Sequence, residues 1–92
     1  MVATGTKTFL VETYVPHLDA SAARAMSTRL RAAVPELQRE GVAVRWLGSF
    51  AVIDDETYIC MLAAGNAGDA VRANERANLH YDHVVEVIAI DP

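Results

Sequence analysis

The sequence has few of the residues that cross-link or interrupt a small protein. Its 92 residues include one cysteine, three prolines and five glycines. A single cysteine, Cys60, excludes a disulfide framework within the chain and fits a reducing compartment. Hydrophobic residues make up 52% of the chain, yet no apolar run approaches the roughly 20 residues of a membrane span. The start has no apolar run either, so the protein is expected to be soluble and cytoplasmic, without a membrane partner.

Basic residues are also scarce, with 8 Lys and Arg against 12 Asp and Glu and a formal net charge of -4. Half of them fall in one predicted helix, where they alternate with apolar and acidic residues: Arg24, Arg29, Arg31 and Arg39. This pattern is typical of a solvated helix face. Aromatic residues do not interleave with these arginines, so nucleic acid is not expected as a partner.

Strand signals are densest between residues 42 and 64, where β-branched and aromatic residues flank the acidic turn Asp54–Glu56. This stretch predicts a hairpin. A strand is also predicted for residues 7–15, where Pro16 ends it, and another for residues 83–90. Residues 1–6 are expected to be disordered, and residues 7–92 are expected to form a single domain.

Two helices are predicted between the strands. Asp19 is a candidate N-cap for the first, which Gly41 closes, and its buried stripe recurs at helical spacing. Pro35 lies inside this helix, so a kink or break is expected near Ala33. The second helix is predicted to start at Asn66, and Asn78 is expected to adopt the left-handed conformation that ends it.

The resulting order is β-α-β-β-α-β, which predicts an α+β, ferredoxin-like fold. In this arrangement two helices cover one face of a four-stranded antiparallel sheet with strand order 4-1-3-2. A domain of this size buries a modest fraction of its surface, and a chain with a mean hydropathy of +0.15 is slightly apolar for a monomer. We therefore expect a homodimer.

Several segments resemble a small bacterial ferredoxin-like family, a domain of unknown function with one member described as nickel-binding. These segments are Phe9–Glu12 with Tyr14, Val44–Phe50, Asp54–Cys60, Ala70–Asn74 and Asp82–Val87. Together they span nearly the whole domain, and their combination is moderately specific. The resemblance implies a homodimeric domain that could bind a metal, and it implies no established reaction.

The sheet face opposite the helices is the first candidate site. Strand alternation is expected to turn Phe9, Val11, Trp46, Ile59 and Met61 toward the helices. It is expected to leave on the other face the ionisable and polar residues Glu12, Arg45, Ser49, Tyr58, Cys60 and Glu86, among apolar ones. One interpretation is a dimer interface with a buried ion pair. The other is a ligand or substrate cavity lined by Glu12, Arg45, Tyr58 and Glu86, whose carboxylates could act as acid or base.

The second candidate site is the rim where the first strand ends and its two neighbours begin. All three histidines of the chain are expected there, namely His17, His80 and His83, together with several carboxylates. Imidazole and carboxylate ligands suit nickel, zinc or copper. Their spacing matches no metal motif, and the alternative interpretation is that they are exposed loop residues.

Cys60, in the middle of a strand, is interpreted as a buried structural thiol rather than a nucleophile. No catalytic motif is recognisable, so a homodimeric protein that binds a metal ion of the nickel type or a small ligand is preferred over an enzyme. The alternative is a cofactor-independent isomerase, cyclase or monooxygenase that uses a cavity on the sheet face. A purely structural or regulatory partner domain is the third hypothesis.

Overall fold

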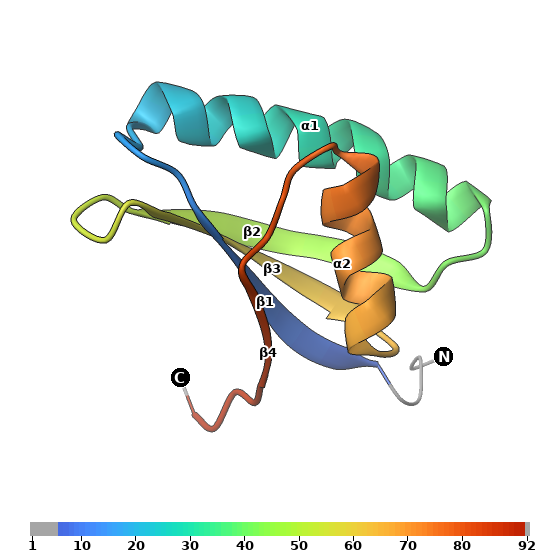
Figure 1. Cartoon of the computed structure of the whole chain (residues 1–92). Helices are drawn as coiled ribbons and strands as arrows, with labels where there is room; N and C mark the ends of the chain where they lie inside the picture. The colour runs from blue at the N-terminus through green and yellow to red at the C-terminus, as the bar shows by residue number, and fades with distance from the viewer. Residues whose placement is uncertain (1–5, 92) are drawn as a thin grey trace.

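The computed structural model describes residues 6–91, which build a four-stranded antiparallel sheet with both helices on one face (Figure 1). The elements, in chain order, are β1 (Lys7–Tyr14), α1 (Ala20–Arg39), β2 (Val44–Val52), β3 (Thr57–Ala64), α2 (Ala67–Arg76) and β4 (His83–Val87). The strand order β2-β3-β1-β4 is the predicted order counted from the other edge, so the ferredoxin-like arrangement is confirmed. The predicted disorder of residues 1–6 concerns a segment of which residues 1–5 lie outside the described part.

Capping residues bound both helices as the sequence predicts. The Asp19 carboxylate accepts a hydrogen bond of 2.8 Å from the backbone N–H of Ala22 at the start of α1. The Asn66 side chain accepts one of 2.8 Å from Asp69 at the start of α2. Past the helix ends, Gly41 has φ +88° and Asn78 has φ +58°, the left-handed conformation that releases the chain from a helix.

The predicted break near Ala33 is wrong, because α1 runs without interruption from Ala20 to Arg39 with Pro35 inside it. The hydrogen bond that Pro35 cannot make is the one to the carbonyl of Arg31, four residues earlier. Arg31 and Pro35 are both exposed, so water can solvate that carbonyl. On the buried side, Val34 and Leu37 anchor the helix in the core on either side of the proline.

The register between β1 and β3 determines which side chains are buried. Val11 pairs with Cys60 and Thr13 pairs with Tyr58, and directly paired residues share a face of a sheet. Because Val11 is fully buried under the helices, Tyr58 and Cys60 face the helices too. The expected orientation of β3 was therefore inverted, and Ile59 lies on the open face instead.

Hydropathy gave no guide to the orientation of β3, since both of its alternating sets are apolar. One set is Tyr58, Cys60, Leu62 and Ala64, and the other is Ile59, Met61 and Ala63. A shift of one residue exchanges the two sets between the faces. The length of the turn between β2 and β3 and the pairing with β1 decide the outcome.

A β-bulge interrupts β2, because Trp46 pairs with Leu62 and Gly48 pairs with the adjacent Met61. One extra residue, Leu47, is thereby inserted into the strand. Alternation restarts after the bulge, so Trp46 and Ser49 point to the same face although they are three positions apart in the strand. Ser49 was expected on the open face and instead lies on the helix side.

The last strand is shorter than the predicted 83–90, since β4 ends at Val87. The last residue pair between β1 and β4 is Thr8 with Val87. Because β1 begins at Lys7, only one residue of β1 is left to pair with the chain after Val87. Glu86 pairs with Phe9 and therefore lies on the helix side, at the sheet edge. Its carboxylate is 3.7 Å from the amine of Lys7; the expectation that it faces away from the helices is corrected.

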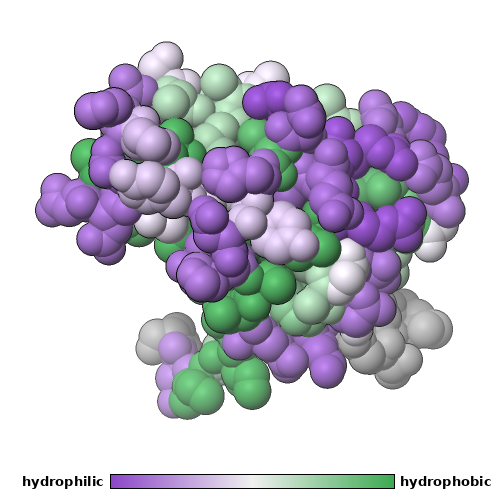
Figure 2. Space-filling model, in the orientation of Figure 1, coloured by the Kyte–Doolittle hydropathy of each residue, from purple (hydrophilic) through white to green (hydrophobic). Residues whose placement is uncertain are grey.

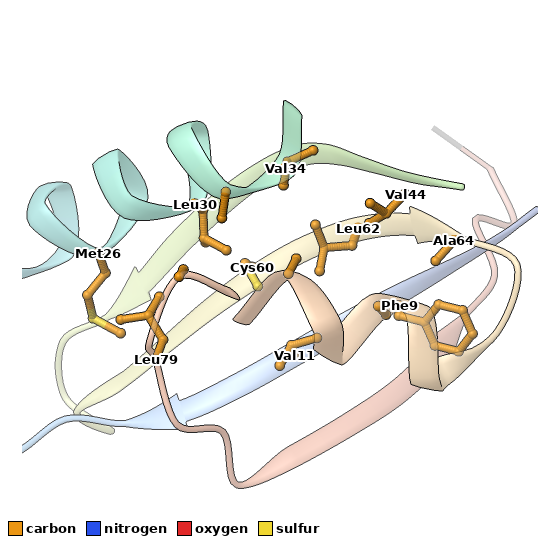
Figure 3. Close-up of a cluster of buried hydrophobic side chains, with 14 of the residues drawn as sticks. Phe9, Val11, Met26, Leu30, Val34, Val44, Cys60, Leu62, Ala64 and Leu79 are labelled. Atoms are coloured by element: carbon orange, nitrogen blue, oxygen red, sulfur yellow. The ribbon is translucent and has the colours of Figure 1, made fainter. Parts of the chain in front are cut away.

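The core lies between the helices and the sheet (Figure 3). Leu30 and Leu37 of α1 and Val11, Leu62 and Cys60 of the sheet are at most 1% exposed. The buried positions of α1 recur every three or four residues, as the predicted stripe requires. None of the helices in the described part of the chain combines the length and hydropathy that a membrane crossing needs.

Replacing Pro35 by alanine should stabilise the protein. The change restores a helical hydrogen bond to Arg31 and removes a ring clash, which together cost about 3 kcal/mol in a helix interior. Part of this gain is offset by the greater entropy of the unfolded chain. We expect the free energy of unfolding in urea to rise by about 1–2 kcal/mol. The matched variant Ala32→Gly should lower it by about 1 kcal/mol, and a Pro35→Ala variant no more stable than the parent would contradict this account of α1.

Candidate functional site

The open face of the sheet exposes large apolar side chains. Leu47 is 42% exposed, Phe50 55%, Val52 37% and Val85 41%. The pairing between strands places them in rows with half-buried Leu10, Ile59 and Met61. Figure 2, in the side-on orientation of Figure 1, shows hydrophobic colour below the helices, around β4 and the chain that follows it. This face is therefore largely apolar although nothing in the described chain covers it.

Two ionisable side chains lie next to each other within this apolar face. Glu12 on β1 pairs directly with His83 on β4, and its other neighbour is Ile59 on β3. Paired residues have Cβ atoms about 4.5–5.5 Å apart and share a face. Within residues 6–91, neither the Glu12 carboxylate nor the His83 imidazole makes a hydrogen bond or ion pair. The pair is free to bind a group from outside the chain.

The five predicted ligand-binding residues are divided between the two faces. Glu12 and Arg45 lie on the open face, and Tyr58, Cys60 and Glu86 lie on the helix side. Arg45 pairs with Ala63 near one end of the sheet, whereas Glu12 pairs with Ile59 nearer the other end, and β3 lies between the two strands. The structure therefore does not bring the five together.

On the helix side, a chain of hydrogen bonds links α1, β3 and β2. The Tyr58 hydroxyl donates to the Ser49 hydroxyl at 2.8 Å and lies 2.8 Å from the Ser27 hydroxyl. The indole N–H of Trp46 donates to the same Ser49 oxygen at 3.0 Å. Above the indole, the guanidinium carbon of Arg31 is 5.2 Å from the ring centroid, a cation–π distance.

Burial raises the pKa of the Tyr58 hydroxyl, although its hydrogen bonds to Ser27 and Ser49 and the charge of Arg31 act in the opposite direction. Tyr58 is therefore a neutral hydrogen-bond donor at physiological pH. Burial likewise raises the pKa of the Cys60 thiol to about 11. A thiol that stays protonated is a poor nucleophile, which agrees with its interpretation as a structural residue.

Cys60 has one polar neighbour, Asn74 of α2. Its sulfur donates to the Asn74 side-chain oxygen at 3.4 Å. Asn74 is fully buried, and its side-chain nitrogen has no hydrogen-bond partner among the described residues. The backbone carbonyl of Asn74 accepts a hydrogen bond of 2.8 Å from the backbone N–H of Leu79. This bond anchors the turn after α2. We interpret the pair as part of the packing between α2 and the sheet.

The rim of the sheet is held by a glutamate in the β2–β3 turn. The Glu56 carboxylate accepts from the backbone N–H of His17 and, at 3.1 Å, from the Tyr14 hydroxyl. Hydrogen bonding to His17 and Tyr14 lowers the pKa of Glu56, and the bond to Glu56 raises the pKa of Tyr14. His17 and Glu56 themselves have φ +60° and +50°, a strained conformation for such residues. This contact therefore ties the β2–β3 turn to the start of α1.

The three histidines predicted as metal ligands do not converge. His17 uses its backbone to contact Glu56, His80 lies 3.7 Å from the Asp82 carboxylate, and His83 belongs to the open face. Within residues 6–91, no three His, Cys, Asp or Glu side chains gather closely enough to hold a metal ion. A single copy of the chain thus offers pairs of such ligands at most.

A surface depression of about 260 Å³ lies between the two helices, lined by Leu37, Arg72, Glu75 and Arg76. Arg76 bridges the helices through two bonds of 2.8 Å to Glu40 and one of 3.2 Å to Glu36. Its hydrogen bonds lower the pKa of the Glu40 carboxyl. Because the Arg76 guanidinium is already paired with two carboxylates, we interpret the depression as part of the contact between the helices and not as an empty anion site.

Sequence reasoning missed the cluster around Ser49 because it assumed unbroken alternation in β2. A glycine inside a strand often marks a bulge, and Gly48 supplied that signal. It did not identify Ser27 and Arg31, whose contacts depend on how α1 crosses the sheet.

Comparisons with known proteins support the fold and leave the activity open. No family model and no curated protein matches the chain. The crystal structure of SCO4226 from Streptomyces coelicolor A3(2) is similar, with a TM-score of 0.74 over 91% of this chain and 99% of that one. The two sequences are 16% identical, so the similarity concerns the fold alone.

The Glu56 contact should make stability depend on acidity. A carboxylate whose pKa is lowered by folding stabilises the protein above its unfolded pKa, and this contribution is lost as the pH falls through the folded pKa. Urea midpoints measured at pH 7 and about pH 3 should therefore differ less for Glu56→Gln than for the parent. Asp54→Asn, in the same turn, should keep the parental difference. If the urea midpoint falls by the same amount between pH 7 and about pH 3 in the parent and in Glu56→Gln, Glu56 does not have this role.

The bulge in β2 should depend on glycine at position 48. Gly48 has φ +153°, and a Cβ there would meet no atom within 4 Å, so Gly48→Ala introduces backbone strain without a clash. We expect a loss of about 1–3 kcal/mol and a shifted emission of Trp46 as its bond to Ser49 weakens. Gly65→Ala, at a position without positive φ and 3.9 Å from the nearest atom, should leave the emission unchanged. Unchanged emission in Gly48→Ala would refute the coupling.

Proposed function

We propose that this protein is a homodimer that holds a divalent transition-metal ion of the nickel type between the open faces of its two sheets. The ligands are Glu12 and His83 of each copy. The observation that carries the proposal is the direct pairing of these two unpartnered side chains within an apolar, exposed face.

The size of the face supports a second copy as its cover. The strands lie about 4.8 Å apart and rise about 3.3 Å per residue. With 8, 9 and 8 residues in β1, β2 and β3 and 5 in β4, they give a face of roughly 20 by 26 Å that is shorter at the β4 edge. This is the scale of one side of a standard interface, which buries about 800 Å² per partner. Covering Leu47, Phe50 and Val85 removes apolar area from water, which is the main favourable term in such association.

The charges of the face suit a two-fold symmetric pairing. In a symmetric dimer the same surface meets itself, so it must carry groups that complement their own copies. The face has one carboxylate, Glu12, and two basic groups, His83 and Arg45. A face with both signs of charge can pair with itself without leaving like charges opposed.

Ligand number explains why the second copy is needed. Nickel, zinc and copper take imidazole and carboxylate ligands, and a closed tetrahedral site uses four of them. One chain offers only two at this position, and a two-fold axis beside Glu12 and His83 doubles the set. His17 and His80 are not part of this set, which revises the metal ligands predicted from the sequence.

Light scattering and calorimetry test the proposal together. The parent protein should scatter as a dimer and bind nickel with saturation at one ion per two chains. Glu12→Gln and His83→Ala should each weaken nickel binding at least about tenfold, since metal affinity is sensitive to each group that shapes the site. Both variants should remain folded, because neither side chain contributes to the core.

The matched control is His80→Ala, which removes an imidazole from the neighbouring loop without touching the open face. Its nickel affinity should equal that of the parent. A monomer at all concentrations, an absence of saturable heat with the parent, or an equal loss in His80→Ala would each overturn the proposal.

A further inference from the structure

The hydroxyl cluster beneath α1 has a hydrogen-bond donor left over. The Tyr58 hydroxyl donates to Ser49, so its contact with Ser27 must use the Ser27 hydrogen. The indole N–H of Trp46 also donates to the Ser49 oxygen. Ser49 therefore accepts two hydrogen bonds, and its own O–H hydrogen is committed to no atom of the described chain.

Arg31 brings an unpaired positive charge to the same place. Its guanidinium lies against the Trp46 ring, and stacking uses the flat face of the group while its N–H donors stay free at the edge. Within residues 6–91, Arg31 makes no hydrogen bond and no ion pair. The charge of Arg31 is close enough to act on the pKa of the Tyr58 hydroxyl, so guanidinium and hydroxyls belong to one cluster.

The local fold explains how these groups meet. Ser27 and Arg31 are four residues apart on α1 and so share one face of the helix. A long side chain on a helix covers the turn before its own Cα, which carries Arg31 back toward Ser27. On the sheet, the bulge at Gly48 turns Ser49 and Trp46 to the same side. Bulges are frequent beside binding and active sites, where they redirect a side chain.

We propose that Arg31 and Ser49 bind the carboxylate of a small organic acid at the edge between α1 and β2, beside the Trp46 ring. The guanidinium fork matches two carboxylate oxygens, and the spare Ser49 hydrogen supplies a further donor. Arg31 is the one charged member of the cluster, which balances a single negative charge. Half-buried Trp46 gives the apolar part of the acid a surface to contact. This site is on the opposite side of the sheet from Glu12 and His83 and does not depend on them.

Trp46 is the single tryptophan of the chain, so its fluorescence reports on this position directly. The probe is butyrate, a carboxylate with a short apolar tail, titrated at constant ionic strength against chloride and in the presence of a chelator. The emission of Trp46 should change with saturation. Arg31→Gln and Ser49→Ala should each weaken butyrate binding about tenfold or more, because each variant removes a hydrogen bond to a charged group.

Two variants separate a binding role from a structural one. Arg45→Gln removes the same charge one residue from Trp46 but on the opposite face, and it should leave butyrate binding unchanged. Ser49→Thr keeps the hydroxyl and should retain binding that Ser49→Ala loses. The proposal is overturned by an unsaturable response, by an equal loss in Arg45→Gln, or by phosphate binding more tightly than butyrate, which would assign the site to a different anion.

Discussion

The antiparallel register between β1 and β3 is the constraint on which the rest of the molecule depends. Pairing Val11 with Cys60 sends Tyr58, Cys60 and Leu62 under the helices and leaves Ile59 on the other side. A shift of one residue would bury Ile59 and Met61 and would present Tyr58 and Cys60 to a partner. Glu12, next to buried Val11, lies on the open face, where the register between β1 and β4 places it beside His83. The register of β1 with β3 thus assigns Glu12 and Tyr58, one member of each candidate site, to opposite faces.

The sequence predicted the architecture well because local signals agreed with each other. Asp19, Gly41, Asn66 and Asn78 marked the helix ends correctly, since capping depends on a few neighbouring residues. Orientation within β3 could not be predicted in this way. Both of its faces are apolar, so the choice depends on contacts between strands that are distant in sequence.

The candidate sites were harder to predict for the same reason. Pairing of Glu12 with His83 requires knowing where β4 starts against β1, and alternation alone had placed Glu86 beside Glu12. The cluster at Ser49 required both the bulge and the crossing of α1. Pro35 shows the opposite error: a strong local rule predicted a break, but Val34 and Leu37 hold the helix in the core around it. Long-range packing prevailed in each case.

Arg76 links the folding of the short helix α2 to that of its neighbour α1. The helix α2 has 10 residues, fewer than an isolated helix needs to be stable in water. Arg76 lies in the last turn of α2 and contacts Glu36 in the last turn of α1 and the C-cap residue Glu40. The carboxyl ends of both helices therefore meet at one guanidinium. Each end carries partial negative charge from its backbone dipoles. Arg76 therefore offsets the two carboxylates that lie beside these negative helix ends, and the folding of α2 becomes coupled to the completion of α1.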